Sequence, residues 1–421
     1  MDRRQFIKGA GLLGLLATLQ ACRLTNLTGT EPVARVSTSM PTSTRWPTFT
    51  PTRTNTPLPT PGPDTPVPTG TTSPEATQAG LTPTSTAEGT LTPTATPTPT
   101  PTPYPPGPPS KLGLFVTRFH PQVLDLVAAG QPALIKTLEI DKNYAKGMKD
   151  SSPTSMIVGR LVLGQQNLDV DPMSLAHEFV KELLPLASDP TRMDAFEAWE
   201  AYNEPVADTV DKMKRLADFE AERTRILAEN GIRSVVGNFA TGHPPLELWP
   251  HFGPALDAIR QYDGYLGLHE YSAPVMQYLS GNLQAPGDPD QGDEGWLTLR
   301  YRKAYRRYLA PLGYPDLRIL ITECGVDGLI SPRPGPPEAR GWQDFVGTWL
   351  ENGLRDDPPG VYMDQLIWYD QHLQRDDYIG GAAIFLAGTN DSRWDSYDVL
   401  GPGAGRMVEL LTQYLEVHPP T

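Results

Sequence analysis

Cysteine and basic residues are scarce in this sequence. Two cysteines, Cys22 and Cys324, occur in 421 residues. Two cysteines are too few for a small secreted scaffold held by several disulfides, so the core must be held by burial.

Basic residues are outnumbered by acidic ones. Lys and Arg number 35 against 49 Asp and Glu, which gives a formal net charge of −14. That charge opposes binding to nucleic acids and other polyanions, so we predict no nucleic-acid partner. The basic run at 300–308 precedes apolar residues at helical spacing, and we interpret it as the solvated face of an outer helix.

Several catalytic motifs are also missing. There is no G-x-S-x-G elbow and no Walker loop. The His177-Glu178 and His269-Glu270 pairs lack a second histidine four residues after the first, so the sequence does not support zincin chemistry.

The first 22 residues have the pattern of an export signal. Arg3-Arg4-Gln5-Phe6-Ile7-Lys8 resembles a twin-arginine motif, and the apolar region from Gly9 to Leu19 is too short to span a bilayer. Leu19-Gln20-Ala21-Cys22 resembles a lipobox, in which Cys22 is lipidated and becomes the new N-terminus. We therefore expect an exported protein that a lipid anchors to the outer face of the cytoplasmic membrane or to the cell surface. The alternative is an uncleaved membrane anchor.

Residues 23–110 are rich in Thr and Pro and include an alternating Thr-Pro repeat at 96–103. Such a segment cannot bury enough apolar surface to offset its ordering entropy, and proline removes backbone donors. We predict a disordered, extended linker with threonines suited to O-glycosylation.

Residues 111–421 alternate short apolar runs with longer amphipathic ones, which is the pattern of βα units and a parallel sheet. The predicted strands are 112–117, 133–138, 156–163, 195–202, 234–239, 264–269, 319–322 and 381–386. Helices are expected after Asp171, from about 208 to 230, and from 405 to 417. Eight strands are the number that a (β/α)8 TIM barrel requires, so we assign this segment to the α/β class as one barrel domain.

Polar side chains gather at the ends of the predicted strands. They include Arg118, Asn203, Glu204, Asn238, His269, Tyr271 and Glu323. Because the active sites of such barrels lie at the C-terminal ends of the strands, this distribution favours catalysis. Two carboxylates at the mouth of a barrel supply the proton donor and the nucleophile or base that glycosidic bond cleavage needs.

Simpler roles for these residues have to be weighed. Glu204 precedes Pro205 and could cap a helix, and His269 could be a core histidine. Cys324 could be a thiol nucleophile, but no adjacent His-bearing motif supports its activation, so we interpret it as a small buried residue. Strand alternation sends Glu270 to the opposite side from His269 and Tyr271, so only one of these two sets can face the barrel mouth.

The segment from about 112 to 417 resembles the retaining TIM-barrel glycoside hydrolases of clan A. Its Asn203-Glu204-Pro205 matches the Asn-Glu pair that ends strand 4 in that clan, and Thr322-Glu323 matches the second Glu, at the end of strand 7. Gly237-Asn238-Phe239 and His269-Glu270-Tyr271 are similar to strands 5 and 6 of these enzymes. The likeness is at the level of the clan and names no family or substrate.

The resemblance implies a role for each matched residue. Glu204 would be the general acid/base, with a raised pKa, and Glu323 the ionised nucleophile. Asn203 would bind the sugar 2-hydroxyl, while Tyr271 donates to Glu323, with Arg118 or His269 as helpers. Neither a metal nor an organic cofactor is implied.

Two positions depart from the clan pattern. Lys136 and Thr137 stand where the second strand usually ends in an arginine, and the eighth run ends in Phe-Leu-Ala without the tryptophan often found there. Trp296 and Trp394 lie in the loops after the sixth and eighth runs, as sugar platforms or as packing under their own loops. The rival hypothesis is a catalytically silent barrel that binds envelope or external glycans. The oligomeric state stays open.

Overall fold

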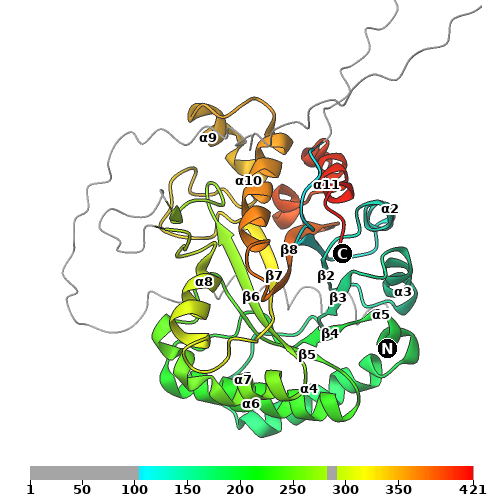
Figure 1. The fold of residues 1–421 in the computed structure, drawn as a ribbon, viewed down its shortest axis with the longest axis vertical. Helices are drawn as coiled ribbons and strands as arrows, with labels where there is room; N and C mark the ends of the chain where they lie inside the picture. The colour runs from blue at the N-terminus through cyan, green and yellow to red at the C-terminus, as the bar shows by residue number, and fades with distance from the viewer. Residues whose placement is uncertain (1–103, 282–291, 421) are drawn as a thin grey trace, which may run out of the picture. The chain divides into compact units, whose positions relative to one another are not determined.

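The computed structural model describes residues 104–281 and 292–420. The predicted export signal, Cys22 and most of the predicted linker lie outside these residues. Eight parallel strands form a closed barrel in which each strand pairs with its neighbours in sequence, and β8 closes on β1 (Figure 1). The predicted (β/α)8 barrel is therefore confirmed. The strands are β1 (Leu112–Val116), β2 (Leu134–Thr137), β3 (Met156–Gly159), β4 (Ala198–Glu200), β5 (Ser234–Phe239), β6 (Tyr265–Ser272), β7 (Ile319–Val326) and β8 (Ile379–Ala387).

Each of the eight predicted runs overlaps a strand. β6, β7 and β8 extend beyond the predicted bounds, and β4 is much shorter than expected. Residues 190–195 form a short helix, because Asp189 accepts hydrogen bonds from the backbone amides of Thr191 and Arg192 and Pro190 occupies the first helical turn. This helix delays the start of β4 to Ala198.

Helices connect the strands around the barrel. They are α2 (Pro121–Gly130), α3 (Lys142–Ser151), α4 (Pro172–Ala187), α5 (Pro190–Ala195), α6 (Val210–Glu229), α7 (Gly253–Gln261), α8 (Arg300–Ala304), α9 (Val346–Glu351), α10 (Pro358–Leu373) and α11 (Met407–Glu416). Short 3-10 turns are η2 (Leu246–His251), η5 (Trp342–Phe345), η6 (Ser392–Tyr397) and η7 (Pro402–Ala404), and η4 (Tyr305–Leu309) is a π-helical turn that continues α8. In Figure 1, α4, α6 and α7 line one side of the barrel, and α10 and α11 lie on the opposite side.

Capping residues explain where the main helices begin. Asp171 accepts a hydrogen bond from the Ser174 amide at the start of α4, as the sequence predicts, and Thr209 accepts one from the Lys212 amide at the start of α6. Satisfying these free amides stabilises a helix by about 1 kcal/mol each. Because α6 begins only after Thr209, residues 201–208 form a loop between β4 and α6.

The prediction that the basic residues at 300–308 form a solvated helix face is wrong in part. Arg302 and Lys303 are buried, with 1% and 0% of their surface exposed. The Arg302 guanidinium lies 2.7 Å from an Asp376 carboxylate oxygen and also donates to the His372 carbonyl. Burial of a charge is tolerated when it is paired and hydrogen-bonded in this way.

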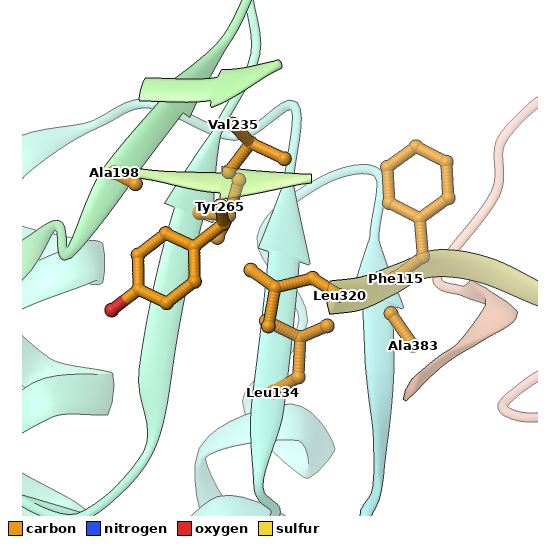
Figure 2. Close-up of a cluster of buried hydrophobic side chains, with 8 residues drawn as sticks. Phe115, Leu134, Ala198, Val235, Tyr265, Leu320 and Ala383 are labelled. Atoms are coloured by element: carbon orange, nitrogen blue, oxygen red, sulfur yellow. The ribbon is translucent and has the colours of Figure 1, made fainter. Parts of the chain in front are cut away.

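One buried side chain from each strand fills the centre of the barrel (Figure 2). These residues are Phe115, Leu134, Val158, Ala198, Val235, Tyr265, Leu320 and Ala383. The layer makes the barrel a packed core with no open pore, so chemistry is confined to the strand ends above it.

Residues 104–110, predicted as the end of the disordered linker, instead pack against the C-terminal region. The Tyr104 and Tyr414 rings meet edge to face at 5.5 Å, and the Ser110 amide donates to the His418 carbonyl. Among residues 104–281 and 292–420, no helix combines the length and apolar character needed to cross a membrane.

Candidate active site

Glu204 lies in the loop that follows β4. Its backbone is in the left-handed region, with φ of 46°, which is uncommon for a residue with a side chain. The alternative that Glu204 caps a helix is wrong, because α6 begins at Val210 and is capped by Thr209. Its carboxylate is instead directed to His269 on β6, with Nδ1 of His269 2.9 Å from Oε1 of Glu204.

Glu323 lies on β7, next to an irregularity in the pairing of that strand with β8, and is 5% exposed. Its two carboxylate oxygens have different partners. Oε1 accepts a hydrogen bond from Lys136 Nζ at 2.8 Å, and Oε2 accepts one from the Tyr271 hydroxyl at 2.7 Å. The prediction that Tyr271 donates to Glu323 is therefore confirmed.

Burial by itself would raise the pKa of Glu323. The electrostatic influence of His269, Lys136 and Arg160 outweighs that effect and holds the pKa of Glu323 well below the usual range of a glutamate. The environment thus favours the ionised form, which is the form that a nucleophile or base requires.

His269 brings the two glutamates together. Its Nδ1 lies 2.9 Å from Glu204 Oε1 and 3.5 Å from Glu323 Oε2. One carboxylate oxygen from each glutamate and a His269 ring nitrogen all lie within 4.8 Å of one another. The interpretation of His269 as a core histidine without a role in the site is therefore wrong.

Two cations near Glu323 had no place in the sequence-based site. Lys136 on β2 is fully buried, and Arg160 directly follows β3, with its Nη1 3.5 Å from Glu323 Oε1. Both cations flank the Phe115 ring, with Lys136 Nζ 4.8 Å and Arg160 Cζ 5.7 Å from its centroid. The signal in the sequence is a lysine inside the apolar run Leu134–Thr137, since a lysine is almost never fully buried without a partner.

Arg118 does not help Glu323, so that expectation is wrong. Its guanidinium donates to the carbonyls of Gly388 and Thr389 in the loop after β8, and the residue is exposed. Lys136 and Arg160 provide the positive charge that was expected from Arg118 or from an arginine on the second strand.

The two predicted asparagines are placed differently. Oδ1 of Asn203, beside Glu204, is buried without a hydrogen-bond partner among the described residues. Asn238 on β5 is fully buried with φ of 48°, and a side chain at Gly267 would collide with its Oδ1. An unsatisfied buried amide oxygen is costly unless a ligand or water completes it. Asn203 Oδ1 is therefore an unpaired acceptor beside Glu204, and Oδ1 and Nδ2 of Asn238 are likewise without a partner among the described residues.

The two predicted tryptophan platforms also differ in their surroundings. Trp394 packs edge to face on Phe385 at 5.3 Å, and Phe385 packs on the site residue Tyr271 at 5.9 Å. Trp296 lies under Lys303, whose ammonium is 4.3 Å from the ring centroid. Aromatic contacts thus connect Trp394 to the glutamate pair, whereas Trp296 contacts the outer helix α8.

Glu270 points away from the site, as strand alternation predicts, and its partner on β7, Cys324, does so too. Glu270 accepts hydrogen bonds from the amides of Leu299 and Tyr301 and from the Tyr369 hydroxyl, all outside the barrel. Cys324 is fully buried, and burial raises the pKa of its thiol well above the ordinary value. A thiol nucleophile at this position is therefore excluded on geometry and on ionisation.

Glu204, His269 and Glu323 are also a donor set that a divalent metal accepts. Their other partners oppose such an ion. Glu323 Oε1 already contacts the Lys136 ammonium and the Arg160 guanidinium, and the His269 nitrogen is already bonded to Glu204. A metal would therefore face two fixed positive charges at its nearest carboxylate.

No protein-family model matches the chain, and no curated protein sequence does so either. Among solved structures, the chain is similar to a subgroup II endo-β-1,3-glucanase of glycoside hydrolase family 128 from Pseudomonas viridiflava, at 14% identity and a TM-score of 0.36, over 72% of this chain and 96% of that one. It is similar to a family 39 glycoside hydrolase from Bacteroides cellulosilyticus WH2, at 13% identity and a TM-score of 0.41, over 72% of this chain and 64% of that one. It is also similar to an endo-1,4-β-D-mannanase from Thermotoga petrophila RKU-1, at 10% identity and a TM-score of 0.42, over 73% and 99% of the two chains. The fold assignment rests on the closed barrel of the chain itself.

Proposed function

We propose that this protein is a retaining glycoside hydrolase that acts on β-linked polysaccharides or oligosaccharides. The observation that carries the proposal is the spacing of Glu204 and Glu323, whose carboxylate oxygens approach within 4.8 Å. Retaining enzymes hold their two carboxyl groups about 5–5.5 Å apart, whereas inverting enzymes leave about 6.5–9.5 Å for a water molecule.

In this mechanism, a Glu323 carboxylate oxygen attacks the anomeric carbon while the bond to the leaving oxygen breaks. Glu204 gives its proton to that oxygen, and the sugar is left as an ester of Glu323. A water molecule then gives a proton to Glu204 and attacks the anomeric carbon, which releases Glu323 as a carboxylate. The low pKa of Glu323 suits the nucleophile, and the contact of Glu204 with His269 orients the proton donor.

The rival, a silent barrel that only binds glycans, would not need two glutamates facing one another. Their shared contact with His269 and the bonds of Lys136 and Tyr271 to Glu323 favour the enzyme. A binding surface gains nothing from a buried carboxylate held ionised by two cations, because each buried charge costs desolvation energy.

The test uses the full chain against a panel of aryl β-glycosides and β-linked polysaccharides, beside Glu204→Gln and Glu323→Gln. We expect hydrolysis by the parent and a loss of about 10²–10⁴-fold in Glu204→Gln, the range that general acid–base catalysis supplies. Equal glycan binding by all three proteins without hydrolysis would support the rival.

We also propose that the enzyme is exported and tethered by a lipid on Cys22, with the Thr/Pro-rich segment as a spacer. The support is the order of the twin-arginine-like motif, the short apolar region and the lipobox-like end. Expression of Cys22→Ala should abolish incorporation of labelled fatty acid and release the protein from the membrane fraction. Retention of the unlabelled variant in membranes would contradict the lipid anchor.

A further inference from the structure

Glu200, at the end of β4, is a buried carboxylate that the mechanism above does not use. It is 0% exposed, and neither of its oxygens has a hydrogen-bond partner among the described residues. Lys136 Nζ approaches its Oε2 to 2.9 Å without the direction of a hydrogen bond, so the contact is an ion pair. Unsatisfied buried carboxylates are costly and call for a reason.

Glu200 shares both of its neighbouring cations with Glu323. Lys136 Nζ lies 2.9 Å from Glu200 and 2.8 Å from Glu323. Arg160 lies 4.0 Å from Glu200 through Nε and 3.5 Å from Glu323 through Nη1. Two cations thus lie between two carboxylates, and the formal charge of the four groups is zero.

This balance changes during a double displacement. When Glu323 becomes an ester it loses its negative charge, and Lys136 and Arg160 keep theirs. The formal charge of Lys136, Arg160 and Glu200 together is then +1, and without Glu200 it would be +2. The transition state also carries positive charge on the sugar, which a net positive cluster beneath it would oppose.

We propose that Glu200 is a positioning residue that holds Lys136 and Arg160 in place and balances their charge while Glu323 carries the sugar. The proposal rests on the retaining mechanism proposed above. Glu200 acts through the two cations and not on the substrate, so its removal should affect the rate more than binding.

The kinetic test compares Glu200→Gln with the parent on a hydrolysed glycoside. We expect kcat to fall roughly 10- to 100-fold with little change in KM. Removing one unit charge a few ångströms from the reacting groups in a protein interior changes the activation barrier enough for a rate effect of that size. The double variant Glu200→Gln/Lys136→Met removes one charge of each sign and should recover part of the lost kcat, compared at a pH above the acid limb of every variant. A double variant that is no faster than Glu200→Gln would overturn the charge-balancing role.

Glu220 provides a matched control. It is a glutamate on α6 that is also buried, 1% exposed, and paired with Arg223 outside the barrel. Glu220→Gln should change thermal stability without the fall in kcat. An equal fall in kcat in both variants would reduce the effect of Glu200 to general structural damage and contradict the proposal.

A second readout does not depend on turnover. If Glu200 and Glu323 share the two cations, each becomes more important when the other is absent. Glu323→Gln should therefore lower the Tm more in a Glu200→Gln background than in the parent. Additive losses would overturn the proposal even if the enzyme is active. If the losses in Tm are non-additive but the protein hydrolyses no glycoside, the shared contacts of Glu200 and Glu323 with the two cations would be supported and the proposed glycosidase activity would be rejected.

Discussion

Nδ1 of His269 and Oε1 of Glu204 lie 2.9 Å apart, which connects the proposed proton donor on the β4 loop to β6. Nδ1 of the same ring is 3.5 Å from Glu323, so one histidine sets the relative position of both carboxylates. Glu204 has a positive φ, a backbone conformation that persists only where the surrounding structure holds it. In the proposed mechanism, the geometry of acid catalysis therefore depends on His269.

Replacing His269 with Ala should weaken proton donation by Glu204. We expect kcat/KM to fall about 10- to 100-fold on glycosides with poor leaving groups, which need a proton to depart. The fall should be smaller on nitrophenyl glycosides, whose leaving group is already stable as an anion. Steady-state kinetics on both kinds of substrate would check this. Equal losses on both would show that His269 does not act through Glu204.

Lys136→Met should raise the pKa of Glu323, because it removes the ammonium that bonds to Oε1. The other charged and titratable groups around Glu323 are Arg160, Glu200, Glu204, His269 and Tyr271. Since catalysis needs ionised Glu323, the acid limb of the kcat/KM profile should move to higher pH. An unchanged acid limb would mean that Glu323 does not control it.

The same substitution should destabilise the protein. A depressed carboxyl pKa contributes stability above the unfolded-state pKa of about 4.3 and loses it as pH falls through the lower folded-state pKa. Without Lys136 two buried carboxylates share Arg160, so we expect a loss of about 3–5 kcal/mol at neutral pH. The difference from the parent should shrink in acid. Urea unfolding of both proteins at several pH values measures it, and a pH-independent difference would argue against an ionic origin.

Trp394 and Trp296 should differ as substrate platforms. Because Trp394 reaches Tyr271 through Phe385, Trp394→Ala should raise KM about 2- to 10-fold on oligosaccharides with little effect on kcat. Trp296→Ala is the matched comparison and should change KM less, since its ring packs under Lys303. A larger effect at Trp296 would move the sugar-binding surface to the loop after β6.

Activity should survive removal of divalent metals. The three possible ligands Glu204, His269 and Glu323 are close enough to bind an ion, but Lys136 and Arg160 occupy the space around Glu323 Oε1 with positive charge. Dialysis against a chelator followed by assays with and without added divalent ions tests this. Loss of activity that one metal restores would replace the proposed mechanism with a metal-dependent one.

The barrel and the two glutamates follow from local patterns in the sequence. Alternating apolar and amphipathic runs mark βα units, and Glu204 and Glu323 each follow such a run. Strand alternation also separates Glu270 from His269 and Tyr271 correctly. These inferences need only the periodicity of one strand at a time.

The buried ion cluster of Lys136, Arg160 and Glu200 could not be inferred in this way. Lys136, Arg160 and Glu200 come from β2, from the residue after β3, and from β4, and their contacts depend on the register between those strands. Register is a property of the closed barrel and not of any one run. The predicted role of Arg118 was wrong for a related reason. Its partners are carbonyls in the loop after β8, which lies beside Arg118 only in the closed barrel.

The anomeric configuration of the first product tests the central claim most directly. Hydrolysis of a β-glycoside substrate would be followed by proton NMR at times short compared with mutarotation of the product. The close approach of Glu204 and Glu323 predicts that the β-anomer appears first and that Glu323→Gln forms none. Initial release of the α-anomer would mean inversion and would contradict a nucleophilic Glu323.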